Sequence, residues 1–308
     1  MRELDVVLEI SETGSLRKAA TRLNITPSAL TRQVQELEAE FGAPLFERTS
    51  QGMRPTAAGH ALLRYARTQK SAFQTLREDL SEIAGGRTGH VAIACSQAIA
   101  QGILPAEVAA FRIANPRVTF DVSAAGHGTA LRALAAYEIH LALVLQPPPA
   151  SGVTMLFQDE APVCAVLKRD HPLAGAGPVR LADCLRFPLA MPGRAFAIRP
   201  LLDAAILRTR LAPWVVLESG VAGLLCNYAL HEPQAVAFQV ACGVDADAGL
   251  CLRPIDRRDM LPPELLLLRM TDRALSPAAA QFAQHLAARL PRQRPSAESP
   301  PALNLVLQ

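Results

Sequence analysis

The chain has 308 residues, of which 50% are hydrophobic and 19% are charged, and its formal net charge is +3. A chain of this length exceeds one ordinary hydrophobic core, so we expect two or three domains, and the composition excludes a mainly disordered protein. No apolar run approaches the ~18 residues of a membrane-spanning helix, and the start MRELDVVLEI carries acids and lacks the apolar core of a signal peptide. We therefore expect a cytoplasmic protein without a membrane partner.

Positive charge is concentrated near the N-terminus. Between residues 14 and 70, nine Lys and Arg residues stand against four acids. This local excess favours a polyanionic partner but does not prove one.

Two short helical patterns follow each other closely in SLRKAATRLNITPSALTRQVQELE, residues 15–38. The first has apolar residues at helical spacing and Ser15 as its predicted N-cap. In the second, Thr26 is the predicted cap and Pro27 takes the first helical position, where its missing N–H costs nothing. The break between them fits only a tight turn, and this predicts a helix-turn-helix.

The second of these helices has two different faces. An apolar stripe at i, i+4 and i+7 predicts burial. The opposite face has short hydroxyl and amide side chains around one arginine, which suits a helix lying in the major groove of DNA. An αα-hairpin with an ordinary polar face is the alternative. The stripe is Leu30, Val34 and Leu37, and the polar face is Ser28, Thr31, Arg32 and Gln35.

A β-wing is predicted directly after this helix, in FGAPLFERTSQGMRPTAAG, residues 41–59. Apolar residues lead into Arg48, a glycine-containing turn follows, and Arg54 precedes a predicted cap at Thr56. Both arginines would then lie beside the DNA backbone, where they could bind phosphates. Each could instead be a solvated loop charge.

These motifs together resemble the winged helix-turn-helix of the LysR-type transcriptional regulators. Thr31 stands where serine is commoner in that family and Leu30 where valine is commoner, and both departures preserve shape and chemistry. The resemblance extends more weakly over residues 90 to about 290. The matching signatures are Gly14-Ser15, Ala19-Ala20, Leu23, Ser28-Ala29-Leu30-Thr31-Arg32, Leu37-Glu38, Gly42, Leu45-Phe46-Glu47-Arg48, Thr56 and Gly59.

The resemblance implies an α+β multidomain regulator whose DNA binding or bending is modulated by a small-molecule effector. Its implied partners are double-stranded DNA, an effector such as an anionic metabolite, further copies of the chain in a homodimer or homotetramer, and RNA polymerase. The predicted DNA-binding residues are Ser15, Thr26, Pro27, Ser28, Thr31, Arg32, Gln35, Arg48 and Arg54.

A linker helix is expected over residues 59–86, after a DNA-binding domain over 1–58, with Gly85-Gly86 as its stop. Apolar residues along it follow a 4-3-4-3 spacing, which is typical of a coiled-coil seam. Packing against its own chain is the alternative, whereas the resemblance implies pairing with a second copy. The seam is Leu62, Ala66, Gln69, Phe73, Leu76, Leu80 and Ile83.

From His90 onward, short β-type runs alternate with helical segments, which predicts βαβ units around largely parallel sheets. The resemblance implies a periplasmic-binding-protein-like effector domain of two α/β subdomains. We expect the first in residues 90–160 plus 268–290 and the second in 161–267, with chain crossovers near Ala161–Leu167 and Leu265–Met270. The Pro- and Ser-rich tail 291–308 is expected to be disordered.

Ligands of such sheets bind at strand C-terminal ends, where loops and helix N-termini present free N–H groups. By position, Arg194 or Arg199 could hold a carboxylate through two hydrogen bonds. Each candidate could also serve only a loop or a helix cap. The effector-binding candidates are Ser96, Gln97, Thr129, Arg194, Arg199, Ser219, Phe238 and Gln239.

The alternative functions are an enzyme, a redox-responsive regulator and a solute-binding protein. No G-x-S-x-G, P-loop, H-E-x-x-H or dinucleotide glycine motif is present, so we expect no enzyme, catalytic residue, metal or cofactor. The six cysteines form no C-x-x-C pair and should be reduced, but Cys242 and Cys251 could form a redox switch. His140, where the family usually has aspartate, is expected to be a surface or hydrogen-bonded residue rather than a pH sensor. A solute-binding protein without DNA binding is the third alternative.

Overall fold

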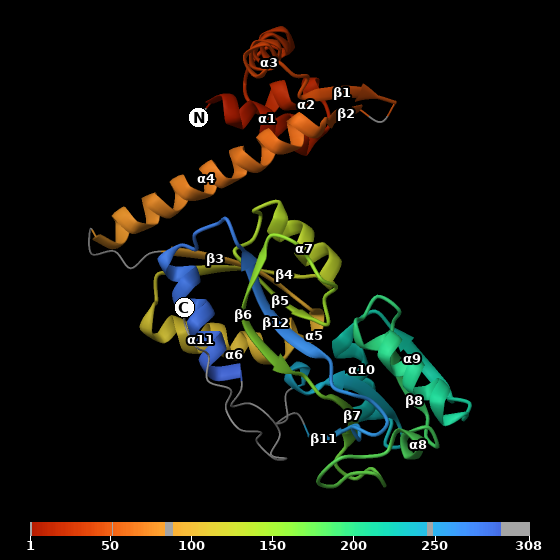
Figure 1. The fold of residues 1–308 in the computed structure, drawn as a ribbon. Coiled ribbons are helices and arrows are strands. Elements are labelled where there is room, and N and C mark those ends of the chain that lie inside the picture. Colours follow the sequence, from red (N-terminus) through yellow and green to blue (C-terminus); the bar gives the residue numbers. More distant parts are fainter. Residues whose placement is uncertain (1, 51, 84–88, 245–248, 291–308) are drawn as a thin grey trace. The chain divides into compact units, whose positions relative to one another are not determined.

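The computed structural model describes residues 2–50, 52–83, 89–244 and 249–290. They form two compact units, one built from the chain up to Gly86 together with Asp272–Ser276, and the other from Arg87–Thr271 and the residues from Pro277 onward. Figure 1 labels the helices and strands of both units. The expected helix stop at Gly85-Gly86 and the tail 291–308 lie outside the described residues.

The N-terminal unit is a winged helix-turn-helix followed by a long helix. Its core is made by the apolar faces of all four helices and the start of the wing, and Ile10, Leu30 and Leu63 are fully buried there. Both predicted N-caps are present: the Ser15 side chain accepts a hydrogen bond from the Lys18 backbone N–H, and the Thr26 side chain accepts one from the Ala29 backbone N–H. The elements are α1 (Arg2–Thr13), α2 (Leu16–Arg22), α3 (Pro27–Phe41), β1 (Phe46–Thr49), β2 (Gly52–Pro55) and α4 (Ala57–Ile83).

A close backbone approach holds the wing against the turn between α1 and α2. The Met53 N–H donates to the Gly14 carbonyl at 2.8 Å. Gly52 has φ +117, and a Cβ at this position would lie 2.5 Å from the Gly14 oxygen. Glycine is therefore required at position 52 on both conformational and steric grounds.

The C-terminal unit contains two five-stranded sheets. The first has the order β4-β3-β5-β12-β6 and the second β11-β7-β10-β8-β9. In each sheet two of the four strand pairings are parallel and two are antiparallel, so four strands run in one direction and one strand, β12 or β7, runs against them. The strands are β3 (Gly89–Cys95), β4 (Val118–Ala124), β5 (Leu141–Leu145), β6 (Val153–Glu160), β7 (Val163–Lys168), β8 (Leu189–Pro192), β9 (Val215–Ser219), β10 (Val236–Val240), β11 (Leu250–Pro254) and β12 (Glu264–Met270).

Helices cover both faces of each sheet. In Figure 1, α6 and α11 lie together on one side of the first sheet and α7 lies on the other. The α7 side packs Ala130 and Leu134 against the small residues Ala92 and Ala94 of β3. The helices are α5 (Gln97–Gln101), α6 (Ile103–Ala114), α7 (His127–Ala135), α8 (Leu181–Cys184), α9 (Ile198–Thr209), α10 (Ala222–His231), α11 (Pro277–Arg289) and a 3₁₀ turn (Ala241–Gly243).

One expected boundary needs correction. The sequence places residues 264–267 in the second subdomain, but β12 lies wholly in the first sheet, where Leu265 pairs with Leu145 on one side and Asp159 on the other. The run ELLLLRM is a strand with a neighbour on each side, which accounts for its continuous apolar sequence. The second crossover therefore precedes Glu264.

Candidate nucleic-acid interface and ligand pocket

The two faces of α3 separate as the sequence predicts. Leu30 is fully buried, and Val34 and Leu37 are each 7% exposed. The side opposite this stripe faces outward. Ser28, Arg32 and Gln35 are exposed and Thr31 is half-buried.

Several predicted DNA-contacting hydroxyls also stabilise the helices that carry them. Thr31 Oγ1 donates to the Pro27 carbonyl at 2.9 Å, one turn earlier, and Thr26 Oγ1 lies 3.1 Å from Ser28 Oγ. Ser15 and Thr26 are N-caps, so their substitution would change helix stability as well as any DNA contact. A hydroxyl can still accept a further hydrogen bond while it donates one.

Arg32 is paired with an acid on its own helix. Its Nε lies 2.8 Å from Glu36 Oε1, and 78% of the Arg32 side chain is exposed. The hydrogen bond and charge of Glu36 raise the pKa of the Arg32 guanidinium above its usual value. Because both side chains are well solvated, this pair does not prevent Arg32 from turning toward a base edge.

The wing places its two arginines on opposite faces. Arg54 pairs with Glu47 across the strands, whereas Arg48 pairs with Met53. Adjacent residues of a strand point to opposite sides, so the Arg48 and Arg54 side chains leave the wing from opposite faces. Both side chains are exposed.

Glu38 joins α3 to the wing, a role that the sequence motif alone did not suggest. Its Oε1 accepts hydrogen bonds from the backbone N–H of Leu45 at 2.7 Å and of Phe46 at 3.3 Å. The carbonyl of Glu38 accepts from Gly42, whose left-handed conformation ends α3. The wing therefore starts at a fixed position relative to the outward face of α3.

The seam of the linker helix divides into two parts. Ala66 is fully buried and Leu62 packs with it in the core of the N-terminal unit. Farther along α4, Phe73, Leu76 and Leu80 are 44%, 50% and 56% exposed. The second part is thus an apolar stripe on the surface of the single chain.

A cavity of about 520 Å³ lies in the C-terminal unit. Its lining comes from loops and helix starts at the carboxyl ends of β3, β4 and β5, and from the α9 and β10 segments of the second sheet. Four of the predicted effector-binding residues line it, namely Ser96, Gln97, Thr129 and Gln239.

The other four predicted residues do not line the cavity. Phe238 is fully buried beside Gln239, and its side chain points to the opposite face of β10 because strand residues alternate. Arg194 and Ser219 do not reach the cavity, whereas their chain neighbours Ala195 and Gly220 line it.

Arg199 holds the second sheet together instead of facing the cavity. Its Nε lies 2.9 Å from Asp203 and its Nη1 lies 2.9 Å from Glu218 and 2.7 Å from the Pro192 carbonyl. The Arg199 guanidinium is expected from the sequence to bind the carboxylate of an effector. It is instead already paired with two carboxylates and a backbone carbonyl of the protein itself.

Buried polar atoms without protein partners remain in the cavity. Among the described residues, Ser96 Oγ and Gln239 Nε2 are buried and have no hydrogen-bond partner. Gln239 is 1% exposed. Such orphaned groups are rare in folded proteins, and water or a ligand usually satisfies them.

Sequence reasoning missed two ionisable residues of the lining, His127 and Arg132, both on α7. Arg132 Nη2 donates to Thr129 Oγ1 at 2.9 Å. Of the lining residues on α7 the sequence predicted only Thr129, and Arg132 lies three residues beyond it on the same face of the helix.

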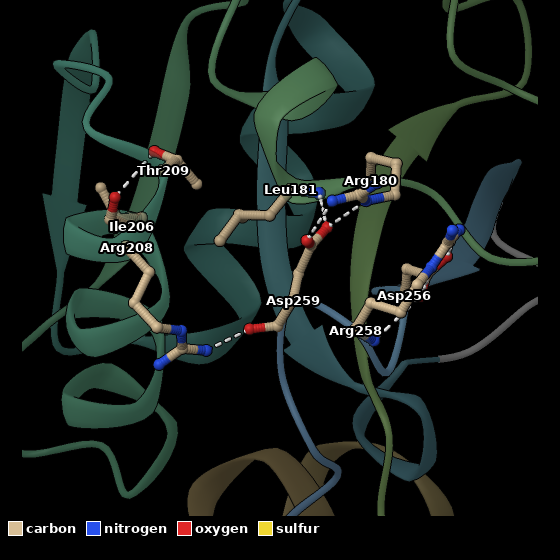
Figure 2. A network of polar contacts seen from close by, with 8 residues as sticks. All are labelled: Arg180, Leu181, Ile206, Arg208, Thr209, Asp256, Arg258 and Asp259. Carbon is tan, nitrogen blue, oxygen red and sulfur yellow. Dashed lines mark hydrogen bonds and ion pairs between the residues drawn. The ribbon is translucent and has the colours of Figure 1, made fainter.

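The segment between β11 and β12, which forms the second chain crossover, is held to the second sheet by an ionic network. Figure 2 shows the Asp259 carboxylate against Arg180 and the Leu181 N–H, and the Arg208 guanidinium at the Asp259 backbone carbonyl. The two Arg180 bonds to Asp259 measure 2.8 and 2.7 Å. Because α9 carries Ile198 in the cavity lining and Arg208 near its other end, this helix connects the cavity to the crossover.

The fold does not bring Cys242 and Cys251 together. Cys242 follows the end of β10 that pairs with Val163, whereas Cys251 lies opposite Leu167 on the other side of β7. The offset along β7 alone is roughly 13 Å, and a disulfide requires Cα atoms about 4.4–6.8 Å apart. Burial also raises the pKa of the Cys242 thiol to about 12, which suppresses its reactive thiolate form.

His140 is hydrogen-bonded, in line with the expectation of a surface or hydrogen-bonded residue. Its Nδ1 accepts the Ala92 backbone N–H at 3.0 Å. Within the described part of the chain, no three His, Cys, Asp or Glu residues form a group that could bind a metal, and no helix is long and apolar enough to cross a membrane.

Two family profiles match this chain. The LysR substrate binding domain matches residues 84–291, and the bacterial regulatory helix-turn-helix protein profile of the lysR family matches residues 1–60.

Similar curated proteins are transcriptional regulators. The HTH-type transcriptional regulator CbbR of Sinorhizobium medicae is 33% identical over 175 residues, covering 57% of this chain and 56% of the relative. A probable nitrogen assimilation transcriptional activator of Synechococcus elongatus is 34% identical over 179 residues, covering 56% of this chain and 57% of the relative. The matched region thus spans little more than half the length of these relatives.

Solved structures share the fold. A full-length OxyR from Pseudomonas aeruginosa matches with a TM-score of 0.65 at 17% identity, over 94% of each chain. Full-length CbnR complexed with its target DNA matches with a TM-score of 0.57 at 20% identity, over 93% of this chain and 98% of that one.

Proposed function

Because the chain belongs to the LysR family of bacterial helix-turn-helix regulators, we propose that it is a sequence-specific transcriptional regulator whose DNA binding or bending responds to a small molecule. The N-terminal unit would bind double-stranded DNA, and the cavity of the C-terminal unit would bind the effector. Because the proposed binding partner is DNA, we expect the protein in the cytoplasm.

The outward face of α3 carries this proposal. Ser28, Arg32 and Gln35 are exposed on the side opposite the buried stripe of Leu30 and Val34. Hydroxyl, guanidinium and amide groups form the hydrogen bonds that distinguish base edges in the major groove. The exposed Arg48 and Arg54 of the wing would bind phosphates on either side of it.

The exposed part of the linker seam supports the proposal of a homodimer or homotetramer. Phe73, Leu76 and Leu80 form an apolar stripe that a second α4 would cover. Two recognition helices would then read half-sites about 34 Å apart, or a multiple of this distance.

We propose that each part of the chain has its own role. Residues 1–58 bind DNA, 59–86 connect and pair the subunits, and the two α/β subdomains enclose the effector. The subdomain boundary is taken before Glu264, since β12 belongs to the first sheet.

Gel-shift titration with the DNA that flanks the coding gene tests the DNA-binding proposal. Affinity should fall steeply with salt, because each phosphate contact releases counterions. Arg32→Ala should weaken specific binding by about 1–3 kcal/mol if a base contact is lost. Gln33→Ala is the matched control, since Gln33 is exposed on α3 but lies outside the polar face. Unchanged affinity in Arg32→Ala would show that another face meets the DNA.

A further inference from the structure

We propose that the cavity takes an organic monoanion whose far end carries an uncharged hydrogen-bond acceptor, with Gln239 and Ser96 binding that acceptor and Arg132 binding the anion. This inference rests on the proposed effector function and assigns the chemical class of the effector.

Gln239 defines the polarity of the deep end of the cavity. Its Oε1 accepts the Val240 backbone N–H at 3.0 Å, and only the oxygen of the amide can accept a hydrogen bond. The amide orientation is therefore determined, and the atom without a partner is the donor Nε2. A ligand that satisfies Gln239 must present an acceptor there.

Ser96 adds a second buried donor to the lining. Its Oγ is buried and, among the described residues, has no partner, although Ser96 sits at the N-cap position of α5. Gln97, the next residue, is already used, because its Oε1 accepts the Ala222 N–H at the start of α10 at 3.0 Å. Ser96 and Gln239 are thus the lining residues with unused buried hydrogen-bonding atoms.

The deep end requires an uncharged acceptor. Arg132 and His127 are the ionisable residues among the described lining, and both belong to α7. A carboxylate beside Gln239 and Ser96 would be buried with neutral donors and without a cation, which is strongly unfavourable. A carbonyl, hydroxyl or ether oxygen meets the same donors without that cost.

The outer end is suited to one negative charge. Arg132 is exposed, and after its bond to Thr129 the guanidinium keeps further N–H donors. The first turn of the nine-residue helix α7 has no side-chain cap, and a Cβ on Gly128 would lie 3.8 Å from Arg132 Nη1. The Thr129 and Ala130 N–H groups already donate to the Gly126 carbonyl, so the Arg132 guanidinium beside Gly128 is the main anion-binding group at this helix N-terminus.

Other ligand classes fit less well. None of the described lining residues is an aspartate or glutamate, so an amine would find no counter-ion. A dicarboxylate would place its second charge against neutral donors. The fully paired Arg199 is not available to compensate it.

A matched set of linear probes tests this class with the full chain. At four, five and six carbons, the ω-hydroxycarboxylate, the plain carboxylate, the dicarboxylate and the diol are compared by thermal shift and isothermal titration. We expect the ω-hydroxycarboxylates to raise the Tm most at equal concentration. Preferred binding of a dicarboxylate, diol or plain carboxylate would overturn the assignment, and so would a Tm that no probe changes.

Two variants separate the ends of the ligand. Gln239→Met should weaken binding of the ω-hydroxycarboxylate at least tenfold and bring it to the level of the plain carboxylate. Arg132→Gln should weaken both acids and leave the diol unchanged. Gln101→Met is the control, because Gln101 is exposed on α5 and does not line the cavity. Equal losses for all probes in either variant would show a structural rather than a recognition role.

DNA binding without any probe separates this inference from the proposed function. All three variants should retain the gel shift of the unsubstituted chain, since none lies in the N-terminal unit. A failed probe set with an intact gel shift rejects only the ligand class, whereas a chain that never binds DNA rejects the regulator.

Discussion

The Glu38 carboxylate accepts the Leu45 backbone N–H at 2.7 Å, and this bond ties the end of α3 to the first residue before the wing. Glu38 also accepts from Phe46 at 3.3 Å. One acid thus sets how the helix and the wing are presented together. Glu38 fixes the geometry because it accepts hydrogen bonds from two half-buried backbone N–H groups that would otherwise lack these partners.

Glu38→Ala should therefore lower both stability and DNA affinity. The loss of a charged acceptor for two backbone N–H groups should cost about 1–3 kcal/mol of the free energy of unfolding. Chemical denaturation and gel shift of the same samples measure the two effects. Glu40→Ala is the control, because Glu40 is exposed on α3. Equal behaviour of both variants would contradict the anchoring role.

Glu36→Gln should strengthen DNA binding. The substitution removes a negative charge beside the proposed DNA surface and releases Arg32 from its 2.8 Å ion pair. The gain should disappear when Arg32→Ala is also present, and a double-mutant cycle by gel shift measures this coupling. Additive effects would show that Glu36 acts only through general repulsion.

Asp259→Asn should destabilise the C-terminal unit by about 1 kcal/mol, a value reduced because Arg180 is half exposed. The Arg180 hydrogen bond lowers the pKa of Asp259, so the folded state favours the carboxylate. This contribution is present above the unfolded pKa of 3.8 and is lost as pH falls through the lower folded pKa. Acid unfolding curves should therefore converge for the two proteins at the acidic end. A constant difference between them would contradict the role of the charge.

His171 should make the C-terminal unit less stable in mild acid. Its Nδ1 accepts the Leu173 N–H at 2.9 Å and its ring lies 4.6 Å from that of Phe187. Burial lowers the pKa of His171 below the usual 6.5. Stability is then full above about pH 6.5 and falls below it, because the unfolded chain takes up the proton first. His171→Gln should flatten the dependence of Tm on pH between 7 and 5, whereas the exposed His231→Gln should not.

Peroxide should leave DNA binding unchanged. Burial raises the pKa values of Cys95, Cys164 and Cys242 to about 12, so their thiolates are scarce near neutral pH. Thiol titration of the native chain should show these three groups as unreactive until denaturant is added. A peroxide-dependent gel shift abolished by Cys242→Ser would reverse this conclusion.

Local features of the N-terminal unit could be predicted from sequence because neighbouring residues decide them. Ser15 and Thr26 cap their helices through N–H groups three residues away, and the spacing of Leu30, Val34 and Leu37 determines the buried face of α3. These are short-range properties of the backbone period and of cap chemistry. The position of the opposite face, for which we propose DNA binding, follows directly from them.

The lining of the cavity could be predicted only in part from the sequence, because it is formed by contacts between residues far apart in the chain. Strand ends suggested Ser96, Gln97, Thr129 and Gln239, which line the cavity. The partners of Arg199, however, come from α9 itself and from the neighbouring strand β9. Whether an arginine is free or already neutralised depends on which carboxylates the fold brings near it. The sequence by itself thus determined the helix faces, the caps and the alternation of strands and helices, since these depend on local periodicity. Only the tertiary structure decided the strand order, the place of β12 and the charge of the cavity, because those depend on long-range packing.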